Sequence, residues 1–133
     1  MAWSEFLSQF RRIADAQAAG ALFAPLAEEE VEVAAFVYLA EDQRVLGMRE
    51  VRSESRETFD LPIRAVVADA LRFDARGVVM AHNHPSGDST PSAADREATR
   101  LLARALDPLG VRLIDHLVVT RHGVTSFRTL GLL

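Results

Sequence analysis

The residues best suited to chemistry lie in one short stretch, where His82 and His84 are followed by Ser92 and Asp95. The two histidines stand two apart at the end of a predicted strand, so both imidazoles leave the same face of a sheet. Ser92 and Asp95 stand three apart at the start of a predicted helix, and such positions also share a face. The Pro- and Gly-containing loop between them can fold the helix start back over the strand end. The spacing therefore predicts that two imidazoles and a carboxylate meet at one point.

Two imidazoles and a carboxylate are a ligand set of catalytic zinc, which keeps its fourth position for water. Zinc lowers the pKa of that water to about 7 and polarises a carbonyl oxygen. A nearby glutamate would serve as general base, and the Ser92 hydroxyl could donate to a developing oxyanion. Ser92 has an alternative, purely local role, in which its side chain caps the helix by accepting from backbone N–H groups.

The composition narrows the class of protein around this candidate site. The chain has 133 residues, which fits about one domain. It contains no cysteine and 4 histidines, and its formal net charge is −4. The missing cysteines exclude disulfide scaffolds, Cys-based zinc knuckles, iron–sulfur clusters and thiol nucleophiles. The negative charge argues against a dedicated nucleic-acid binder. No apolar stretch approaches the ~20 residues that a bilayer requires and no signal peptide is recognisable, which predicts a cytoplasmic protein without a membrane partner.

Predicted helices alternate with predicted strands, which favours an α/β fold with a mixed sheet flanked by helices. We expect strands over 31–40, 45–51, 78–81, 111–120 and 124–127. We expect helices from Ser4 to a stop at Gly20, from a cap at Asp60 with Pro62 in the first turn to about Leu71, and from a cap at Thr90 with Pro91 in the first turn to Leu106. Residues 21–30, which end in three glutamates, are expected to form a solvated turn.

The pattern His82-x-His84-x7-Ser92-x2-Asp95 resembles the JAMM metalloprotease motif at every position. The strings AHNHPSGD and PSAAD around it are similar to the RadC branch of that superfamily, as are LIDHL at 113–117 and the C-terminal residues 126–133. The resemblance covers roughly residues 30–133. It implies a JAB/MPN fold with the three-layer layout of cytidine deaminases, one Zn²⁺, and hydrolysis of a peptide or isopeptide bond.

The resemblance also implies roles for individual residues. His82, His84 and Asp95 correspond to the metal ligands of the family, and Ser92 to the serine that assists the oxyanion.

The catalytic glutamate of the family stands at the start of the first core strand. Aligning Tyr38-Leu39 on the family pattern places Val33 there, with Glu32 one residue away. One residue in a strand reverses the face, so Glu32 reaches the site only through a bulge or a shifted alignment. We favour Glu32 as the general base and keep Glu30 and Glu50 as alternatives.

RadC-like proteins resemble a fusion of a helix-hairpin-helix module to the JAB domain, and the segment before residue 29 is too short for that module. We expect an N-terminal helical extension over 1–28 and a RadC-like JAB/MPN domain over 29–133. The first helix and the edge of the predicted hairpin are candidate contact surfaces for a homo-oligomer.

The leading hypothesis is a zinc-dependent metallopeptidase acting on a peptide or protein substrate. One alternative is a zinc-stabilised interaction module in DNA repair or recombination, in which no bond is cut. A metal-dependent nuclease is weaker, because such enzymes use carboxylate-rich sites for Mg²⁺. His116 lies in an apolar predicted strand and is expected to be a buried histidine with satisfied hydrogen bonds.

Overall fold

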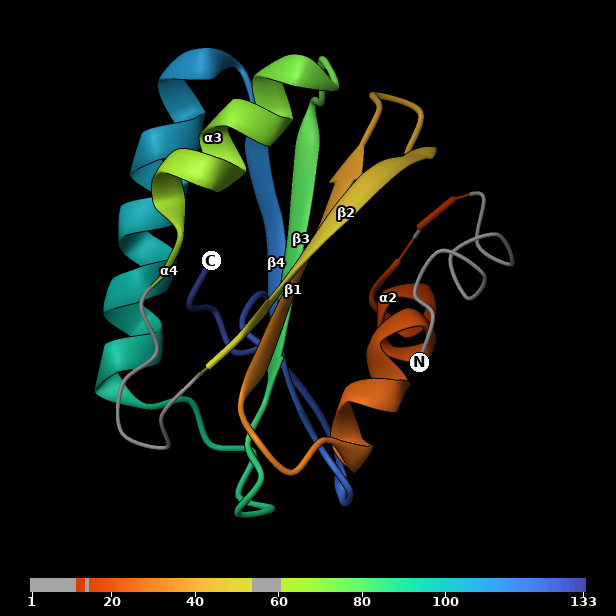
Figure 1. The fold of residues 1–133 in the computed structure, drawn as a ribbon, viewed down its shortest axis with the longest axis vertical. Helices are drawn as coiled ribbons and strands as arrows, with labels where there is room; N and C mark the ends of the chain where they lie inside the picture. Colours follow the sequence, from red (N-terminus) through yellow and green to blue (C-terminus); the bar gives the residue numbers. More distant parts are fainter. Residues whose placement is uncertain (1–11, 14, 54–60) are drawn as a thin grey trace.

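The computed structural model describes residues 12–13, 15–53 and 61–133. In these residues a five-stranded sheet lies between two layers of helices (Figure 1). Helices α3, Ile63–Arg72, and α4, Ala93–Leu106, cover one face, and α2, Ala16–Phe23, covers the other. The prediction of an α/β fold with a mixed sheet flanked by helices is confirmed.

The strands are β1, Val33–Leu39; β2, Val45–Arg52; β3, Gly77–Asn83; β4, Arg112–Thr120; and β5, Gly123–Ser126. Their order in the sheet is β2-β1-β3-β4-β5. Only β3 and β4 pair in parallel among these neighbours, and α4 forms the crossover that a parallel pair requires. All five predicted strands are confirmed, with small differences at their ends. The central strands β1 and β3 are buried along their whole length, which explains their uninterrupted apolar runs.

Alternation along the central strands directs side chains into two apolar clusters, one on each face of the sheet. Val33, Ala35, Val79 and Ala81 pack on the side of α2. On the side of α3 and α4 the corresponding residues are Ala34, Phe36, Val78 and Met80. The same alternation places His82 on the α4 face of β3 and Asn83 on the opposite face.

Two expectations near the N-terminus are wrong. Helix α2 continues through Gly20 to Phe23 and passes into the 3-10 turn η1, Ala24–Glu28. Leu22, Phe23 and Leu26 are buried against the sheet, so residues 21–28 are not a solvated turn. Burial of these large side chains outweighs the cost of about 1 kcal/mol for a glycine within a helix. The predicted start is wrong as well, because α2 begins only at Ala16 with Asp15 as N-cap, and Arg12 forms an isolated β-bridge with Arg44. The part of the predicted first helix before residue 12 lies outside the described residues.

The starts of the other two helices also differ from expectation. Helix α3 has Pro62 as its N-cap rather than in its first turn, and the predicted cap Asp60 lies outside the described residues. Helix α4 begins at Ala93 with Ser92, not Thr90, as N-cap. Val66, Asp69 and Ala70 form the buried side of α3, whereas Leu71, next to the last residue of the helix, is 59% exposed.

Helix α4 continues into the 3-10 turn η2, Asp107–Leu109, and Gly110 follows in the left-handed conformation at φ 73°. Glycine adopts this conformation without steric cost. The predicted end of the helix at Leu106 is confirmed. No helix in the described part of the chain is long and apolar enough to cross a membrane.

Candidate metal centre

The end of β3 and the start of α4 bring the three predicted ligands together. His82, the last residue but one of β3, is buried, and His84 follows the strand and is partly buried. Their Nε2 atoms lie 2.9 Å apart. Asp95, in the first turn of α4, places Oδ1 3.2 Å from His82 Nε2 and Oδ2 3.1 Å from His84 Nε2.

A capping box holds Asp95 in this position. Ser92 Oγ accepts from the Asp95 N–H at 3.0 Å, and Asp95 Oδ2 accepts from the Ser92 N–H at 2.9 Å. This reciprocal pair satisfies two backbone donors that a helix start otherwise leaves free. Ser92 rather than the predicted Thr90 is the N-cap, because of these two residues only Ser92 has an acidic residue three positions later.

The loop between His84 and α4 is anchored from a neighbouring turn. Arg121 donates to the carbonyl oxygens of Pro85 at 3.2 Å and Ser86 at 3.4 Å. Gly87 has φ 90°, and a Cβ added there would lie 2.7 Å from the Arg121 guanidinium. The chain reverses at this glycine, which returns α4 over the end of β3.

Glu32 also faces the cluster. It immediately precedes β1, and its Oε1 lies 3.8 Å from His82 Nε2. Ala34 pairs directly with His82, so these two side chains lie on the same face of the sheet. Glu32 is two positions before Ala34 and therefore points to that face as well. Val33, which the family alignment placed at the glutamate position, packs on the α2 side instead. Of the two routes expected for Glu32, a bulge or a shifted alignment, the register of β1 against β3 agrees with an alignment shifted by one residue.

The two alternative glutamates lie elsewhere. Glu30 is exposed and is not part of the cluster. Glu50 pairs with Ala35, whose side chain packs on the α2 side, and its carboxylate binds Arg52 at 3.0 Å. Of the three candidates, the structure brings only Glu32 to the histidines.

Asn83, which the sequence analysis did not single out, connects β3 to the segment that carries Glu32. Its buried amide accepts from the Val33 N–H at 2.6 Å and donates to the carbonyl oxygens of Glu29 at 3.2 Å and Val31 at 2.9 Å. This role could have been predicted from the position of Asn83. Because His82 and His84 face the α4 side of the sheet, the polar side chain between them must face the α2 side.

The donor set suits a metal ion. One ligand atom from each of Glu32, His82, His84 and Asp95 lies within 4.8 Å of the others. His84 Nδ1 donates to the Asp88 carbonyl at 2.8 Å, so in the neutral ring Nε2 carries a lone pair. That lone pair faces carboxylate oxygens and a second imidazole nitrogen, an arrangement that a cation satisfies. The nitrogen separation of 2.9 Å is near the ~3.3 Å expected around tetrahedral zinc.

The electrostatics of the cluster favour an ionised Asp95 carboxylate. Burial alone would raise the pKa of Asp95, but its bonds to His82 and His84 outweigh burial and hold that pKa far below its usual range. The bond to Asp95 raises the pKa of His84 against the effect of burial. Burial lowers the pKa of His116, behind His82, well below its ordinary value.

The cluster opens into a cavity of about 200 Å³. Besides the four clustered residues, its lining consists of Ser92, Ala94 and Ala98 of the α4 segment, Met80 of β3 and His116 of β4. Ser92 accepts a hydrogen bond from Asp95 N–H but its own hydroxyl proton remains available for a molecule in the cavity. The capping role and the predicted oxyanion role of Ser92 are therefore compatible.

The fold and the cluster together define an α/β protein with a candidate hydrolytic metal centre. The chain belongs to the RadC-like JAB domain family, whose model matches residues 13–132 and so includes α2. The predicted resemblance to this family is confirmed.

Named relatives support the same membership. The chain is 39% identical over 131 residues to a UPF0758 protein of Chromobacterium violaceum, covering 94% of this chain and 58% of the relative. It is 39% identical over 97 residues to the UPF0758 protein YfjY of Escherichia coli, covering 73% and 61%. A UPF0758 protein of Thermotoga maritima is 39% identical over 102 residues, covering 77% and 46%. The chain thus spans about half the length of these relatives.

Proposed function

We propose that this domain is a zinc-dependent metallopeptidase that hydrolyses a peptide or isopeptide bond in a peptide or protein substrate. The observation that carries the proposal is the convergence of two imidazoles and two carboxylates within 4.8 Å, in a cavity open to solvent. Membership of the RadC-like JAB domain family supports the same activity.

The residues present fit zinc better than magnesium, because imidazole nitrogen is a favoured ligand of zinc and a poor one of Mg²⁺. His82, His84 and Asp95 would hold the ion. When bound, zinc supplies a Lewis acid that lowers the pKa of water and polarises the scissile carbonyl.

Glu32 and Ser92 would handle the proton and the developing charge. The Glu32 carboxylate is partly exposed at 3.8 Å from His82, where it can take a proton from water as the oxygen attacks the carbonyl carbon. It then returns the proton to the amine nitrogen as the C–N bond breaks. The free Ser92 hydroxyl proton is donated to the carbonyl oxygen as negative charge develops there.

The first test separates metal binding from hydrolysis with a matched pair of variants. The substrate is a mixture of random peptides and lysine isopeptides, with cleavage read by mass spectrometry and zinc content by elemental analysis. We expect Glu32→Gln to keep stoichiometric zinc and to lose ~100-fold or more in cleavage rate, since a general base contributes on that scale. Glu30→Gln removes a nearby exposed carboxylate outside the cluster and should match the unaltered protein.

Cleavage by Glu32→Gln at the unaltered rate would remove Glu32 from the mechanism. If the unaltered protein carries no zinc and His84→Ala changes neither metal content nor cleavage, the metallopeptidase proposal fails.

A further inference from the structure

His116 lies directly behind the candidate metal centre, in a position that the proposed mechanism does not use. It is fully buried in β4, and its Nε2 lies 2.6 Å from His82 Nδ1. Its other nitrogen, Nδ1, lies 2.6 Å from Thr99 Oγ1 of α4. The ring therefore joins a candidate ligand to the helix that carries Asp95.

The direction of each hydrogen bond in this series follows from its chemical groups. Thr99 Oγ1 donates its single proton to the Asp95 carbonyl oxygen at 2.8 Å, because a carbonyl only accepts. Thr99 Oγ1 must then accept from His116 Nδ1–H, which leaves His116 Nε2 with a lone pair. That lone pair accepts from His82 Nδ1–H, so the lone pair of neutral His82 is on Nε2, facing Asp95 and His84.

The orientation of the His116 ring is fixed from its remaining side. Phe127 stacks on it with ring centroids 4.3 Å apart and planes inclined by 21°, and the Phe127 N–H donates to the His116 carbonyl at 3.0 Å. Phe127 is held by the turn after β5, which Asp115 anchors from the opposite face of β4.

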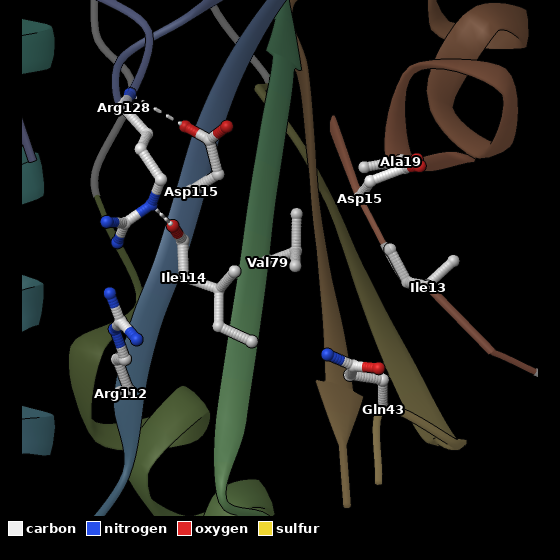
Figure 2. A pocket seen from close by; sticks show the side chains of 9 residues that line it. All are labelled: Ile13, Asp15, Ala19, Gln43, Val79, Arg112, Ile114, Asp115 and Arg128. Carbon is white, nitrogen blue, oxygen red and sulfur yellow. Dashed lines mark hydrogen bonds between the residues drawn. The ribbon is translucent and has the colours of Figure 1, made fainter. Parts of the chain in front are cut away.

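Figure 2 shows the Asp115 anchor at the edge of a second cavity, between β4 and α2. The Asp115 carboxylate accepts from Ser126 Oγ at 2.5 Å and from the Arg128 N–H at 3.0 Å. The Arg128 side chain donates in turn to the Ile114 carbonyl at 2.6 Å. These bonds of Asp115 and Arg128 hold the C-terminal turn in place.

We propose that His116 and Thr99 are positioning residues of the metal centre: their hydrogen bonds select the tautomer of His82 whose Nε2 is free to bind a metal ion. This inference rests on the proposed function of the site. It gives His116 a role beyond that of a satisfied core histidine, because replacing it changes which nitrogen of His82 carries the proton.

The experiment measures tautomers and zinc affinity separately, in the full chain. Long-range ¹H–¹⁵N spectra of the metal-free protein at neutral pH should show both His82 and His116 protonated on Nδ1. Zinc affinity is then measured by competition with a chromophoric chelator. We expect His116→Leu, which removes the acceptor, to bind zinc ~10- to 100-fold more weakly, the range seen when groups that orient metal-ligating histidines are removed.

Two further comparisons separate positioning from packing. His116→Gln restores an acceptor for His82 and should recover part of the lost affinity. Thr99→Val keeps the shape but removes the hydroxyl, so we expect zinc affinity to fall about 10-fold and the His116 ring to lose its single tautomer. Thr99→Ser keeps the hydroxyl and should bind zinc like the unaltered protein.

A His82 ring that carries its proton on Nε2 and not on Nδ1 in the metal-free protein would overturn the inference. So would zinc affinity unchanged in both His116→Leu and Thr99→Val. If the unaltered protein itself fails to bind zinc, the metallopeptidase proposal fails with it, and the tautomer spectra still decide whether the hydrogen bonds run in the stated direction.

Discussion

Asn83 stands between two candidate ligands, yet its side chain serves the backbone of another segment. Its three hydrogen bonds hold the chain at Glu29, Val31 and Val33, on either side of the proposed general base. The position of Glu32 relative to His82 thus depends on a residue whose side chain lies on the opposite face of the sheet.

Asn83→Ala tests this connection. It leaves one backbone N–H and two carbonyls without their partner, so we expect the free energy of unfolding to fall by about 3 kcal/mol in urea titrations. Hydrolysis should fall as well, because Glu32 loses its support, while zinc affinity changes little. Asn83→Asp keeps the acceptor for Val33 but not the two donors and should lie between. Equal urea midpoints for Asn83→Ala and the unaltered protein would contradict this account.

The sequence was sufficient to predict that His82, His84 and Asp95 converge, because strand and helix spacing determine which residues share a face. It was not sufficient to place Glu32, whose face depends on which residue of β1 pairs with His82. His116 was correctly predicted as buried, but its contact with His82 depends on the register of β3 against β4. That register shifts between Val78 and Val79, an irregularity with no local signal.

At the scale of elements, local and tertiary preferences compete at helix ends. Thr90 and Ser92 are both good N-caps, and the choice of Ser92 could have been predicted from Asp95, which completes a capping box. The continuation of α2 through Gly20 could not have been predicted from local sequence, because it depends on the burial of Leu22 and Phe23 against the sheet.

Helix α3 is attached to the sheet through a charged cluster around Asp69. This buried carboxylate binds Arg49 of β2 at 2.5 Å, accepts from the Tyr38 hydroxyl of β1 at 2.8 Å and binds Arg72 at 3.1 Å. The bond to Arg49 lowers the pKa of Asp69, whereas burial and the bond to Asp69 raise that of Tyr38. Asp69 is therefore ionised and Tyr38 protonated at neutral pH.

The lowered pKa of Asp69 predicts a pH dependence of stability. Its ion pairs stabilise the fold above the ordinary carboxyl pKa near 4, and this contribution is lost as pH falls through the lower folded value. At pH 7 we expect Asp69→Asn to unfold more easily by about 2 kcal/mol in denaturant titrations. The difference should shrink steadily below about pH 4.

Asp74→Asn is the matched control, because Asp74 is exposed at the end of the same helix and its contact with Arg76 is 4.0 Å long. Its unfolding free energy should change by less than about 0.5 kcal/mol at any pH. A constant difference between Asp69→Asn and the unaltered protein from pH 7 down to pH 2 would refute the assignment.

At the scale of the molecule, the candidate metal centre joins three elements that are distant in sequence: the start of β1, the end of β3 and the start of α4. An ion that binds the folded state alone stabilises it by mass action. With free zinc at ~100 times its dissociation constant, we expect a gain of about 2.7 kcal/mol, which raises the melting temperature by about 10 °C.

Thermal scans with zinc and with a chelator measure this gain. The chelator should return the protein to its metal-free melting temperature, and His84→Ala should show no zinc-dependent rise. A rise of equal size in His84→Ala would place the responsible zinc somewhere else.

Successive side chains at the end of β3 point to opposite faces of the sheet, so three consecutive residues have two roles. His82 and His84 face the candidate metal site, and Asn83 holds the segment that carries Glu32. Substitution of any one of them would cost only its own task. A one-residue insertion just before His82, without a compensating bulge, would instead exchange the faces: the amide would turn toward the metal cluster and the imidazoles toward the α2 layer. A change of length in this stretch would therefore remove metal binding and the support of the Glu32 segment together, whereas a change of one residue removes one of them directly.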